Sequence, residues 1–409
     1  MRVAPLACYA SAFVFCAVLL AGCSGSSPSS QSLPAGSIGQ TGRIEASGGT
    51  IVFNGRSFKI GSAAAQARAI QARAKMNIVL PPGALYVADP SLNGVMVYNE
   101  FSTGSAILPY GILTGPKSQL NGPVAVSVGT DLPCNTTGIC TQYLWVSNAG
   151  NNTITAYTLP LGSWNQAPAG VITYNGTGAC GPGISNPYGI VHYGPFGTST
   201  SGTILQTSET VVSSTKYYIV GFQANLFGLN PCNVSFTSPN YDSPSGPSIY
   251  YGLSASIFNA NRDTVTSQVL SPGLPPGIGP PGIVWALPHS AATEGTAIQQ
   301  GTTTANSYVW TTTSADTNYP NDALWRCQIK AFTLGTCASA RGGGATPVCV
   351  NPGVSLDDPT FPATSARQKW IYVPNITNGT VTSYRLRVPC TLKSTFVNLV
   401  SPFGVAVQF

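Results

Sequence analysis

One segment of fourteen residues occurs three times in this chain, at 85–98, 144–157 and 371–384, and the copies align without a gap. They share a residue type at six positions: aliphatic, aromatic, valine, Asp or Asn, β-branched and tyrosine. Each copy has an apolar run, a polar stretch with Asn and a second run of alternating residues, which is the pattern of a β-hairpin. The Asp or Asn position is Asp89, Asn148 and Asn375 in turn. The sequence therefore predicts a repeat protein of antiparallel hairpins.

A shorter repeat lies between these hairpins. It reads NGPVAVSV from Asn121, NPYGIVHY from Asn186, PPGIVWAL from Pro280 and SPFGVAVQF from Ser401. Proline presets φ and glycine relieves a tight turn, so Pro and Gly before a β-branched run predict a turn that enters a strand. Placed in order, the two repeats give one unit: a Pro/Gly turn, an inner strand, a connection and a hairpin.

This unit resembles the β-propeller repeats of the NHL and YVTN type, whose blades read roughly P-x-G-I-A-V, then L-Y-V-A-D, then N-N-x-V-x-V-Y. The resemblance covers residues 84–409 unevenly and implies an all-β fold, a β-propeller. A fourth hairpin is predicted between Tyr308 and Phe332, and the degenerate stretch 187–280 has room for two blades. Six blades are therefore predicted, with five or seven left open.

The two ends of the repeat region complete one another. The last nine residues, 401–409, are a turn and an inner strand without a hairpin after them, and the hairpin at Leu85 has no inner strand before it. We expect Phe403 to Gln408 to pair with the strand from Leu85 to Ala88. This pairing would close the ring and leave neither sheet edge open.

The first 83 residues divide into three predicted segments. Residues 1–22 carry Arg2 and then an apolar run too short to span a bilayer, which is typical of a signal peptide. The string Leu-Ala-Gly-Cys ending at Cys23 resembles the lipobox of bacterial lipoproteins, which implies that Cys23 becomes an acylated N-terminus; an ordinary secretory signal is the alternative. Residues 23–50, rich in Ser, Gly and Pro, are predicted to be a flexible tether. Residues 51–83 are predicted to form a small hairpin, turning at Asn54 and Gly55, and a short helix.

Charged residues are scarce in this sequence. They make up 7% of the 409 residues, against about a quarter in an ordinary globular domain. The net charge is +6, but the Lys and Arg residues are scattered and form no stripe that could follow a phosphate backbone. Nucleic acid is therefore not expected as a partner.

Cysteine usage favours an oxidising compartment. Of the 11 cysteines, Cys8 and Cys16 lie in the signal and Cys23 at its end. Eight remain: Cys134, Cys140, Cys180, Cys232, Cys327, Cys337, Cys349 and Cys390. An even number in an exported chain predicts disulfides, with Cys134–Cys140 and Cys327–Cys337 as local candidates. A metal site is the competing interpretation, but the sequence has no CxxC pair and only two histidines, so disulfides are favoured.

Motifs for catalysis are few. The segments GTGACG from Gly176 and GIGPPG from Gly277 match the glycine pattern of dinucleotide sites, which requires a strand before it and a helix after it. Both lead into Pro/Gly turns, and Pro280 and Pro281 exclude a helix there. No GxSxG or HExxH motif occurs, and the Asn-rich hairpin loops lack the carboxylates of a calcium loop. No cofactor is predicted.

The resemblance to propellers also implies an enzymatic alternative. Propellers of this kind include lactonases and lyases that bind a divalent metal at the centre through carboxylates and Asn. The candidate ligands here are Asp89, Asp131, Glu209, Asp263 and Asp316, and the candidate general base is His192, just past an inner strand. Structural roles compete: Asp89 shares its repeat position with Asn148 and Asn375, so the capping of a turn explains all three. For His192 the favoured interpretation is a satisfied side chain at the end of a strand.

The predicted function is a non-catalytic binding or scaffold module, lipid-anchored in the bacterial cell envelope. Long loops rich in Asn, Tyr, Trp and Ser provide contact area without charge, and the loops 160–186 and 230–248 are the predicted contact surfaces. The predicted partners are the membrane, through the lipid, and a protein, peptide or glycan. A metal-dependent propeller hydrolase or lyase is the alternative, and carboxylates converging at the centre would distinguish it.

Overall fold

A computed structural model gives the structure of the chain. It describes residues 44–47, 49–53, 56–74, 83–134, 140–173, 187–193, 203–212, 214–223, 232–237, 244–251, 255–261, 264–271, 277–278, 282–286, 292–302, 306–315, 322–330, 333–334, 349–350, 356–365, 367–386 and 391–408. The chain divides into two compact units, Met1–Ile38 and Gly39–Phe409, and every described residue lies in the second. Among the residues so described, no helix has the length and apolar character needed to cross a membrane.

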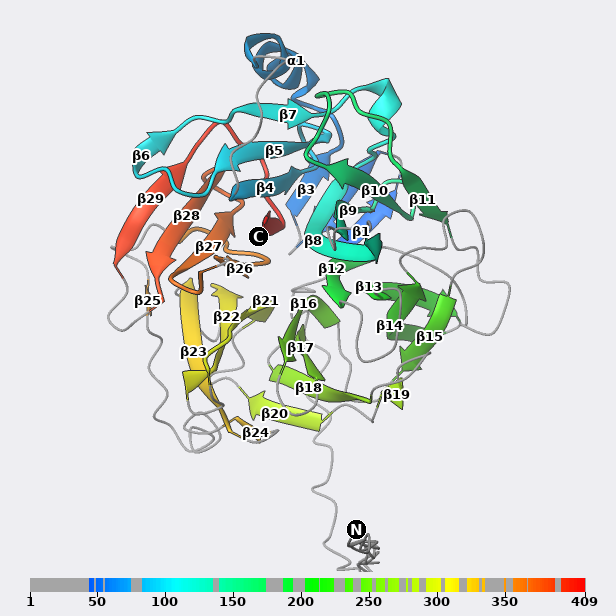
Figure 1. Ribbon diagram of the computed structural model, residues 1–409, viewed down its shortest axis with the longest axis vertical. Helices are drawn as coiled ribbons and strands as arrows, with labels where there is room; N and C mark the ends of the chain where they lie inside the picture. The colour runs from blue at the N-terminus through cyan, green and yellow to red at the C-terminus, as the bar shows by residue number, and fades with distance from the viewer. Residues whose placement is uncertain are drawn as a thin grey trace, which may run out of the picture. The chain divides into compact units, whose positions relative to one another are not determined.

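The second unit is all-β with a propeller-like arrangement of sheets around a common centre (Figure 1). Its described strands form six sheets of four or five strands, and each sheet runs outwards from one innermost strand. The innermost strands are β8 (Pro123–Cys134), β12 (Pro187–Tyr193), β16 (Pro244–Tyr251), β21 (Ala292–Gln299), β26 (Ala363–Thr364) and β30 (Val405–Val407). Each of them contacts the next around the centre, and β30 contacts β8.

The other strands follow outwards in each sheet. They are β9 (Cys140–Asn148), β10 (Thr153–Leu159) and β11 (Gly170–Thr173); β13 (Thr203–Val212), β14 (Ser214–Gln223) and β15 (Cys232–Thr237); β17 (Ala255–Asn261), β18 (Thr264–Ser271), β19 (Gly277–Ile278) and β20 (Gly282–Ala286); β22 (Tyr308–Ser314), β23 (Ala323–Lys330), β24 (Thr333–Leu334) and β25 (Cys349–Val350); β27 (Trp370–Asn375), β28 (Thr380–Arg385), β29 (Leu392–Phe396) and β6 (Gly104–Ile107); and β4 (Ala84–Asp89), β5 (Gly94–Asn99) and β7 (Gly111–Leu113).

The predicted hairpins are confirmed, and they share one register. The first and last repeat positions pair directly in all three copies: Leu85 with Tyr98, Leu144 with Tyr157, and Ile371 with Tyr384. All six of these side chains are fully buried. The repeat therefore preserves a cross-strand aliphatic–tyrosine pair, which is a unit of sheet stabilisation. The fourth predicted hairpin is also present, as β22 paired with β23.

The predicted closure by the C-terminal strand is confirmed as well. Strand β30 pairs antiparallel with β4, with Val405 opposite Val87 and Val407 opposite Leu85. The backbone N–H of Gln408 donates to the carbonyl of Ala84 at 2.9 Å, which extends the pairing beyond the strand. One sheet is therefore built from both ends of the 84–409 region.

A second connection joins the same two sheets at the outer edge. Strand β6 lies between β5 and β7 in the chain, yet it pairs in parallel with β29 as the outermost strand of the neighbouring sheet. The hydroxyl of Ser394 donates to the carbonyl of Ser102 at 2.9 Å beside it. The first and last sheets are thus linked at the centre by β30 and at the rim by β6 (Figure 1).

The N-terminal segment forms a small sheet and a helix. Strands β1 (Ile44–Ser47), β2 (Thr50–Phe53) and β3 (Arg56–Lys59) pair antiparallel, and helix α1 (Ala64–Arg73) follows. The predicted hairpin and helix are therefore present, and among the described residues a 3-10 turn, η1 (Pro116–Ser118), is the remaining helical element. Strand β1 lies inside the segment 23–50, for which the sequence predicted a tether. Its four residues are too few and too polar to be recognised as a strand alone, and pairing with β2 orders them.

One predicted inner strand is misplaced. The segment PPGIVWAL was predicted to be an inner strand, but its strand β20 pairs with β18 at the outer side of a sheet. The inner strand of the next sheet is β21, which contains Gly295 but no proline. The Pro/Gly signal marks entry into a strand, not the position of that strand in the sheet.

Candidate binding site

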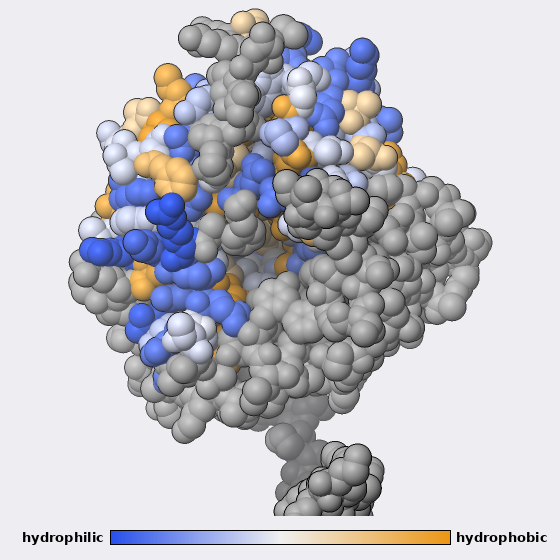
Figure 2. Space-filling model, viewed as in Figure 1, coloured by the Kyte–Doolittle hydropathy of each residue, from blue (hydrophilic) through white to orange (hydrophobic). Residues whose placement is uncertain are grey.

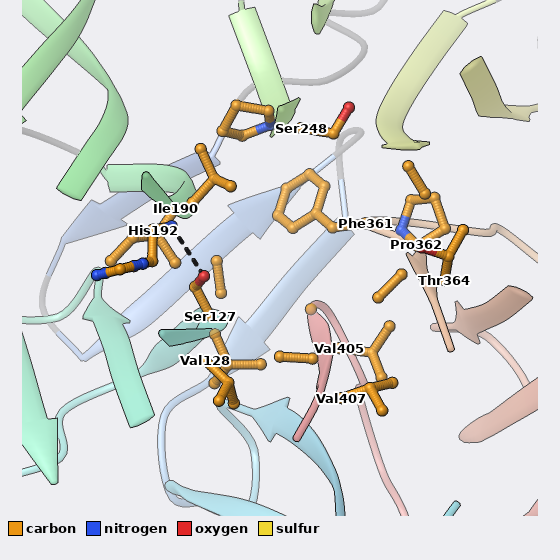
Figure 3. Close-up of a pocket in the computed structure, with 18 of the residues that line it drawn as sticks. Ser127, Val128, Ile190, His192, Ser248, Phe361, Pro362, Thr364, Val405 and Val407 are labelled. Carbon is orange, nitrogen blue, oxygen red and sulfur yellow. Dashed lines mark hydrogen bonds between the residues drawn. The ribbon is translucent and has the colours of Figure 1, made fainter. Parts of the chain in front are cut away.

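The inner strands surround a cavity of about 740 Å³ (Figure 3). Its lining comes from all six innermost strands, from the segments at their ends and from Gln142 on β9. Figure 2 shows one face of the unit, which is hollowed near its centre. A volume of this size falls in the range of about 300–1,000 Å³ that small-molecule sites occupy. The cavity is therefore the candidate functional site.

The lining is largely aliphatic on one side. Val126 and Val128 of β8, Ile190 of β12, and Val405 and Val407 of β30 all line it (Figure 3). Val126, Ile190 and Val405 come from the same place in the Pro/Gly repeat, three residues after its proline. The repeat that sets the fold thus also sets the apolar wall.

The other side carries hydroxyl groups. Ser248 of β16 and Thr296 of β21 are hydrogen-bonded to one another across adjacent inner strands, at 2.7 Å between their oxygens. The hydroxyl of Thr364 on β26 donates to the carbonyl of Ile298 at 2.7 Å. Since these hydroxyls already bond within the protein, this wall is polar in composition but internally satisfied.

The inner strands crowd together at the end where they begin. A Cβ on Gly404 would lie 2.8 Å from the Cα of Ala125, and a Cβ on Gly295 would lie 2.7 Å from the Cα of Phe361. The backbone N–H of Phe361 donates to the carbonyl of Phe403 at 3.2 Å. Glycine is needed at 295 and 404 because backbones approach too closely there for any side chain. The cavity is therefore narrow at this end.

The N-terminal sheet packs against this narrow end. The ring of Phe58 on β3 meets the ring of Phe403 edge-on, with centroids 5.4 Å apart. Ile51 is fully buried, and it lies with Ile60 against Gly122, the glycine just before β8. Phe403 is fully buried as a result. The narrow end of the cavity is thus its closed end.

Glutamines gather at the opposite end of the inner strands. Gln142, Gln300 and Gln368 line the cavity there. All three side chains are half-buried, whereas Phe403 at the closed end is fully buried. The amide of Gln408 donates to Oε1 of Gln142 at 2.9 Å, and the backbone N–H of Gln300 donates to Oε1 of Gln368 at 2.9 Å. This solvent-accessible end is therefore rimmed by neutral amides.

None of the described residues that line the cavity is charged, and His192 is the ionisable one among them. His192 is 8% exposed, and its backbone N–H donates to Oγ of Ser127 at 2.9 Å (Figure 3). Its imidazole packs against Gly129, where any Cβ would overlap the ring. The predicted general base thus does lie in the cavity, and it occupies the repeat position of Val128 and Val407.

Asp89 is not part of the cavity. It is fully buried, and its Oδ2 accepts the backbone N–H of Val400 at 2.7 Å and of Ser401 at 3.1 Å, while Oδ1 accepts that of Leu92 at 3.1 Å. Burial raises the pKa of Asp89, and these hydrogen bonds act in the opposite direction. The carboxylate thus fixes the turn that leads into β30, and these hydrogen bonds occupy its two oxygens.

Asn148 and Asn375 do the same at the other two copies. Oδ1 of Asn148 accepts the backbone N–H of Asn121 at 3.2 Å, just before β8. Oδ1 of Asn375 accepts that of Asp357 at 3.2 Å, in the segment that leads to β26. The Asp or Asn of the hairpin repeat therefore holds the loop that enters an inner strand, which joins the two sequence repeats physically.

The remaining predicted site residues are described only in part. Asp131 and Glu209 lie on β8 and β13, of which only the backbone is described at these positions, and Asp263 and Asp316 fall outside the described residues. Among the residues that the structure describes, no group of three or more His, Cys, Asp or Glu could hold a metal ion. The loop 160–186 is described to residue 173, and 230–248 is described at 232–237 and 244–248.

The cysteines are also described unevenly. Cys134 and Cys140 are direct register partners where β8 pairs with β9. Cys327 is buried on β23, and the backbones of Cys232 and Cys349 lie in β15 and β25. Cys23, Cys180, Cys337 and Cys390 fall outside the described residues. The disulfide pattern stays a prediction.

The sequence reasoning missed the three glutamines of the cavity rim. They do not recur at one position of the repeat, since Gln142 lies on a second strand and Gln300 and Gln368 lie in connections. The composition does give one signal. Because the chain has so few charged residues, any polar groups that line a cavity have to be amides and hydroxyls.

No protein-family model matches the sequence, and no curated protein is similar to it in sequence. Among solved structures the chain is similar to β-propeller proteins. A proposed 6-phosphogluconolactonase from Bacteroides fragilis has a TM-score of 0.46 at 8% identity, over 81% of this chain and 99% of that one. A protein from Lactobacillus plantarum has a TM-score of 0.46 at 8% identity, over 80% and 99%. An α-L-arabinanase from Penicillium chrysogenum, complexed with arabinobiose, has a TM-score of 0.46 at 12% identity, over 68% and 82%. The activities and ligands so named are those of these proteins and imply nothing for this chain.

Proposed function

We propose that this protein is a non-catalytic binding module whose central cavity holds an uncharged small ligand. The observation that carries the proposal is the cavity of about 740 Å³, whose described lining has no charged side chain. A charged ligand transferred into such a cavity would lose its hydration without gaining a counter-charge. An uncharged ligand has no such cost, and burial of its apolar surface favours binding.

We further propose six blades for the propeller. The six innermost strands, each contacting the next, support this number. A ring of this kind gives the cavity a wall in which each strand contributes a few side chains from a rigid backbone. Such a wall suits a preformed site, because ordering it on binding costs little entropy.

The enzymatic alternative is a metal-dependent propeller hydrolase or lyase. His192 lies in the cavity and would be its general base. Its metal ligands would have to come from Asp131, Glu209, Asp263 or Asp316. Asp89 does not serve, because its two carboxylate oxygens hold the turn at 400–401 and the N–H of Leu92.

We also propose that the protein is exported and anchored in the bacterial envelope through a lipid on Cys23. The support is the Leu-Ala-Gly-Cys string and the Ser-rich segment behind it. In a bacterial host, the Cys23→Ala variant should lose labelling by a fatty-acid analogue and leave the membrane fraction. Retention of this variant in the membrane fraction would overturn the anchor.

The binding function is tested with the uncharged dye Nile red on the full chain carrying Cys23→Ala, which removes the proposed lipid. We expect saturable binding with increased fluorescence. Val128→Phe fills part of the cavity, because Val128 lines it and is half-buried. This change should weaken binding at least tenfold, which corresponds to about 1.4 kcal/mol.

Val400→Phe is the matched control, since Val400 is 36% exposed and does not line the cavity. Equal dye affinities for the two phenylalanine variants would refute binding in the cavity. Hydrolysis of simple lactones, abolished by a chelator and restored by a divalent cation, would favour the enzymatic alternative instead.

A further inference from the structure

We propose that the ligand is an uncharged amphiphile, with its apolar part towards the closed end of the cavity and its neutral polar head at the rim formed by Gln142, Gln300 and Gln368. This inference rests on the proposed binding function and specifies the chemical class and orientation of the ligand.

The polarity of the cavity changes along its axis. At the closed end the lining consists of Phe361, Val126, Ile190 and Val405, all at most 6% exposed. The nearby hydroxyl of Ser248 is engaged with Thr296. This end therefore offers an apolar surface with little unused hydrogen-bonding capacity.

The rim of the cavity, in contrast to the closed end, is polar. A glutamine amide can both donate and accept hydrogen bonds. The carbonyl of Gln142 accepts from Gln408, and that of Gln368 accepts from the backbone of Gln300. These bonds fix where the amides lie. Fixed amides can donate to and accept from hydroxyl, ether or amide groups, which are the polar groups of an uncharged head.

The two ends are a short distance apart. Thr130 near the rim is five positions after Ala125 at the closed end, so at about 3.3 Å per residue the wall is about 16 Å long. Since the inner strands crowd at Gly295 and Gly404, a ligand cannot pass through that end. The cavity thus admits an apolar chain of limited length from the rim only.

The test compares three probes with the same hexyl chain: hexyl glucoside, heptanoate and hexyltrimethylammonium. Each is used to displace Nile red from the Cys23→Ala chain. Hexyl glucoside should displace the dye at a concentration at least tenfold below those of both charged probes. Displacement by a charged probe at an equal or lower concentration would overturn the inference while leaving the binding function intact.

The orientation is tested by two isosteric variants. Gln142→Glu keeps the oxygen that accepts from Gln408 but replaces the amide nitrogen by a charged oxygen. It should weaken hexyl glucoside at least threefold and strengthen hexyltrimethylammonium by a similar factor. Gln66→Glu, on the exposed side of α1, is the matched control and should change neither. If the cationic probe gains equally in both variants, or in neither, Gln142 does not contact the head.

The closed end is tested by chain length. From butyl to hexyl glucoside the affinity should rise about fourfold for each added methylene, the change that corresponds to about 0.8 kcal/mol. It should then stop rising as longer chains exceed the depth of the cavity. An undiminished rise to the dodecyl compound would show a channel open at both ends. If Nile red does not bind in the cavity at all, the binding function itself fails, and the inference with it.

Discussion

Phe403→Ala is the substitution that tests the closed ring most directly. Phe403 is fully buried between the N-terminal sheet and the entry to β30. Its ring packs edge-on against Phe58 at 5.4 Å, and its backbone N–H donates to the carbonyl of Ala88 at 3.0 Å. Its carbonyl accepts from the backbone of Phe361. Through its ring and its backbone, this one residue therefore contacts three parts of the chain that are distant in sequence.

The expected loss is large. Phe→Ala in a well-packed core costs about 3–5 kcal/mol, of which the aromatic pair with Phe58 accounts for about 0.5–1.5 kcal/mol. The total stability of a typical domain is only about 5–15 kcal/mol. The backbone hydrogen bonds remain available after the substitution. The loss of stability therefore measures side-chain packing where the ring closes, and not the pairing of β30 with β4.

Phe101→Ala is the matched control. Phe101 is 49% exposed, and the Arg367 guanidinium lies 5.5 Å from the centre of its ring. Its removal should cost at most about 1 kcal/mol. Urea unfolding is followed for both variants and the unaltered chain by tryptophan fluorescence and far-UV circular dichroism. We expect a clearly lower midpoint for Phe403→Ala alone. Midpoints that fall equally in the two variants would refute the placement of Phe403 at the closure.

Three further predictions concern the stability that Asp89 and Glu100 contribute and the pairing of the cysteines. Asp89→Asn should destabilise the protein by about 1–3 kcal/mol although Asn occupies this repeat position elsewhere, because one amide oxygen cannot accept from Leu92, Val400 and Ser401 together; an unchanged urea midpoint would contradict this. Burial raises the pKa of Glu100, with Lys393 and Arg367 opposing the shift. A carboxyl whose pKa is raised by folding contributes stability below the ordinary Glu pKa, and this stability is lost as pH rises through the pKa of the folded state. Relative to the unaltered chain, Glu100→Gln should therefore gain stability between pH 4 and pH 7. An equal difference in stability between the two proteins at both pH values would refute this. Cys134 and Cys140 are register partners, and directly opposed residues lie about 4.5–5.5 Å apart at Cα, within disulfide range. Thiol titration of the denatured, unreduced protein should therefore find almost none of the eight mature cysteines free, and finding most of them free would contradict the pairing.

The sequence predicted the elements whose signals are local. The hairpins followed from a repeat in which position and residue type coincide, and the structure adds their register, as in the pairing of Leu85 with Tyr98. The closure by β30 was predictable because a half unit at each end of the repeat region has to find its complement. Both inferences depend on patterns of two to fourteen residues, which side-chain burial imposes directly.

The cavity and the outer closure could not be predicted in this way. Strand β21 lacks the proline of the other inner strands, so Gly295 alone did not identify it. The crossing of β6 to β29 depends on the spatial approach of two sheets and leaves no pattern in Gly104–Ile107. Gln142, Gln300 and Gln368 line one cavity only because β9 and two connections place them at the same end of the inner strands. Such convergence is a property of the assembled sheets.

The scarcity of charge links the fold to the proposed function. Several of the described carboxylates hold backbone groups at turns: Asp89 binds the turn at 400–401, and Asp322 accepts the backbone N–H groups of Ala315 and Asp358 at 2.8 and 3.0 Å. Ionised carboxylates accept such bonds more strongly than neutral groups do, so the few acidic residues are most effective where a turn has to be fixed. The described lining of the cavity consists of amides, hydroxyls, an imidazole and apolar side chains, without a carboxylate among them. Its selectivity is then expected to come from shape and from the geometry of fixed amides, and salt should have little effect on it, because no charge pair is formed on binding.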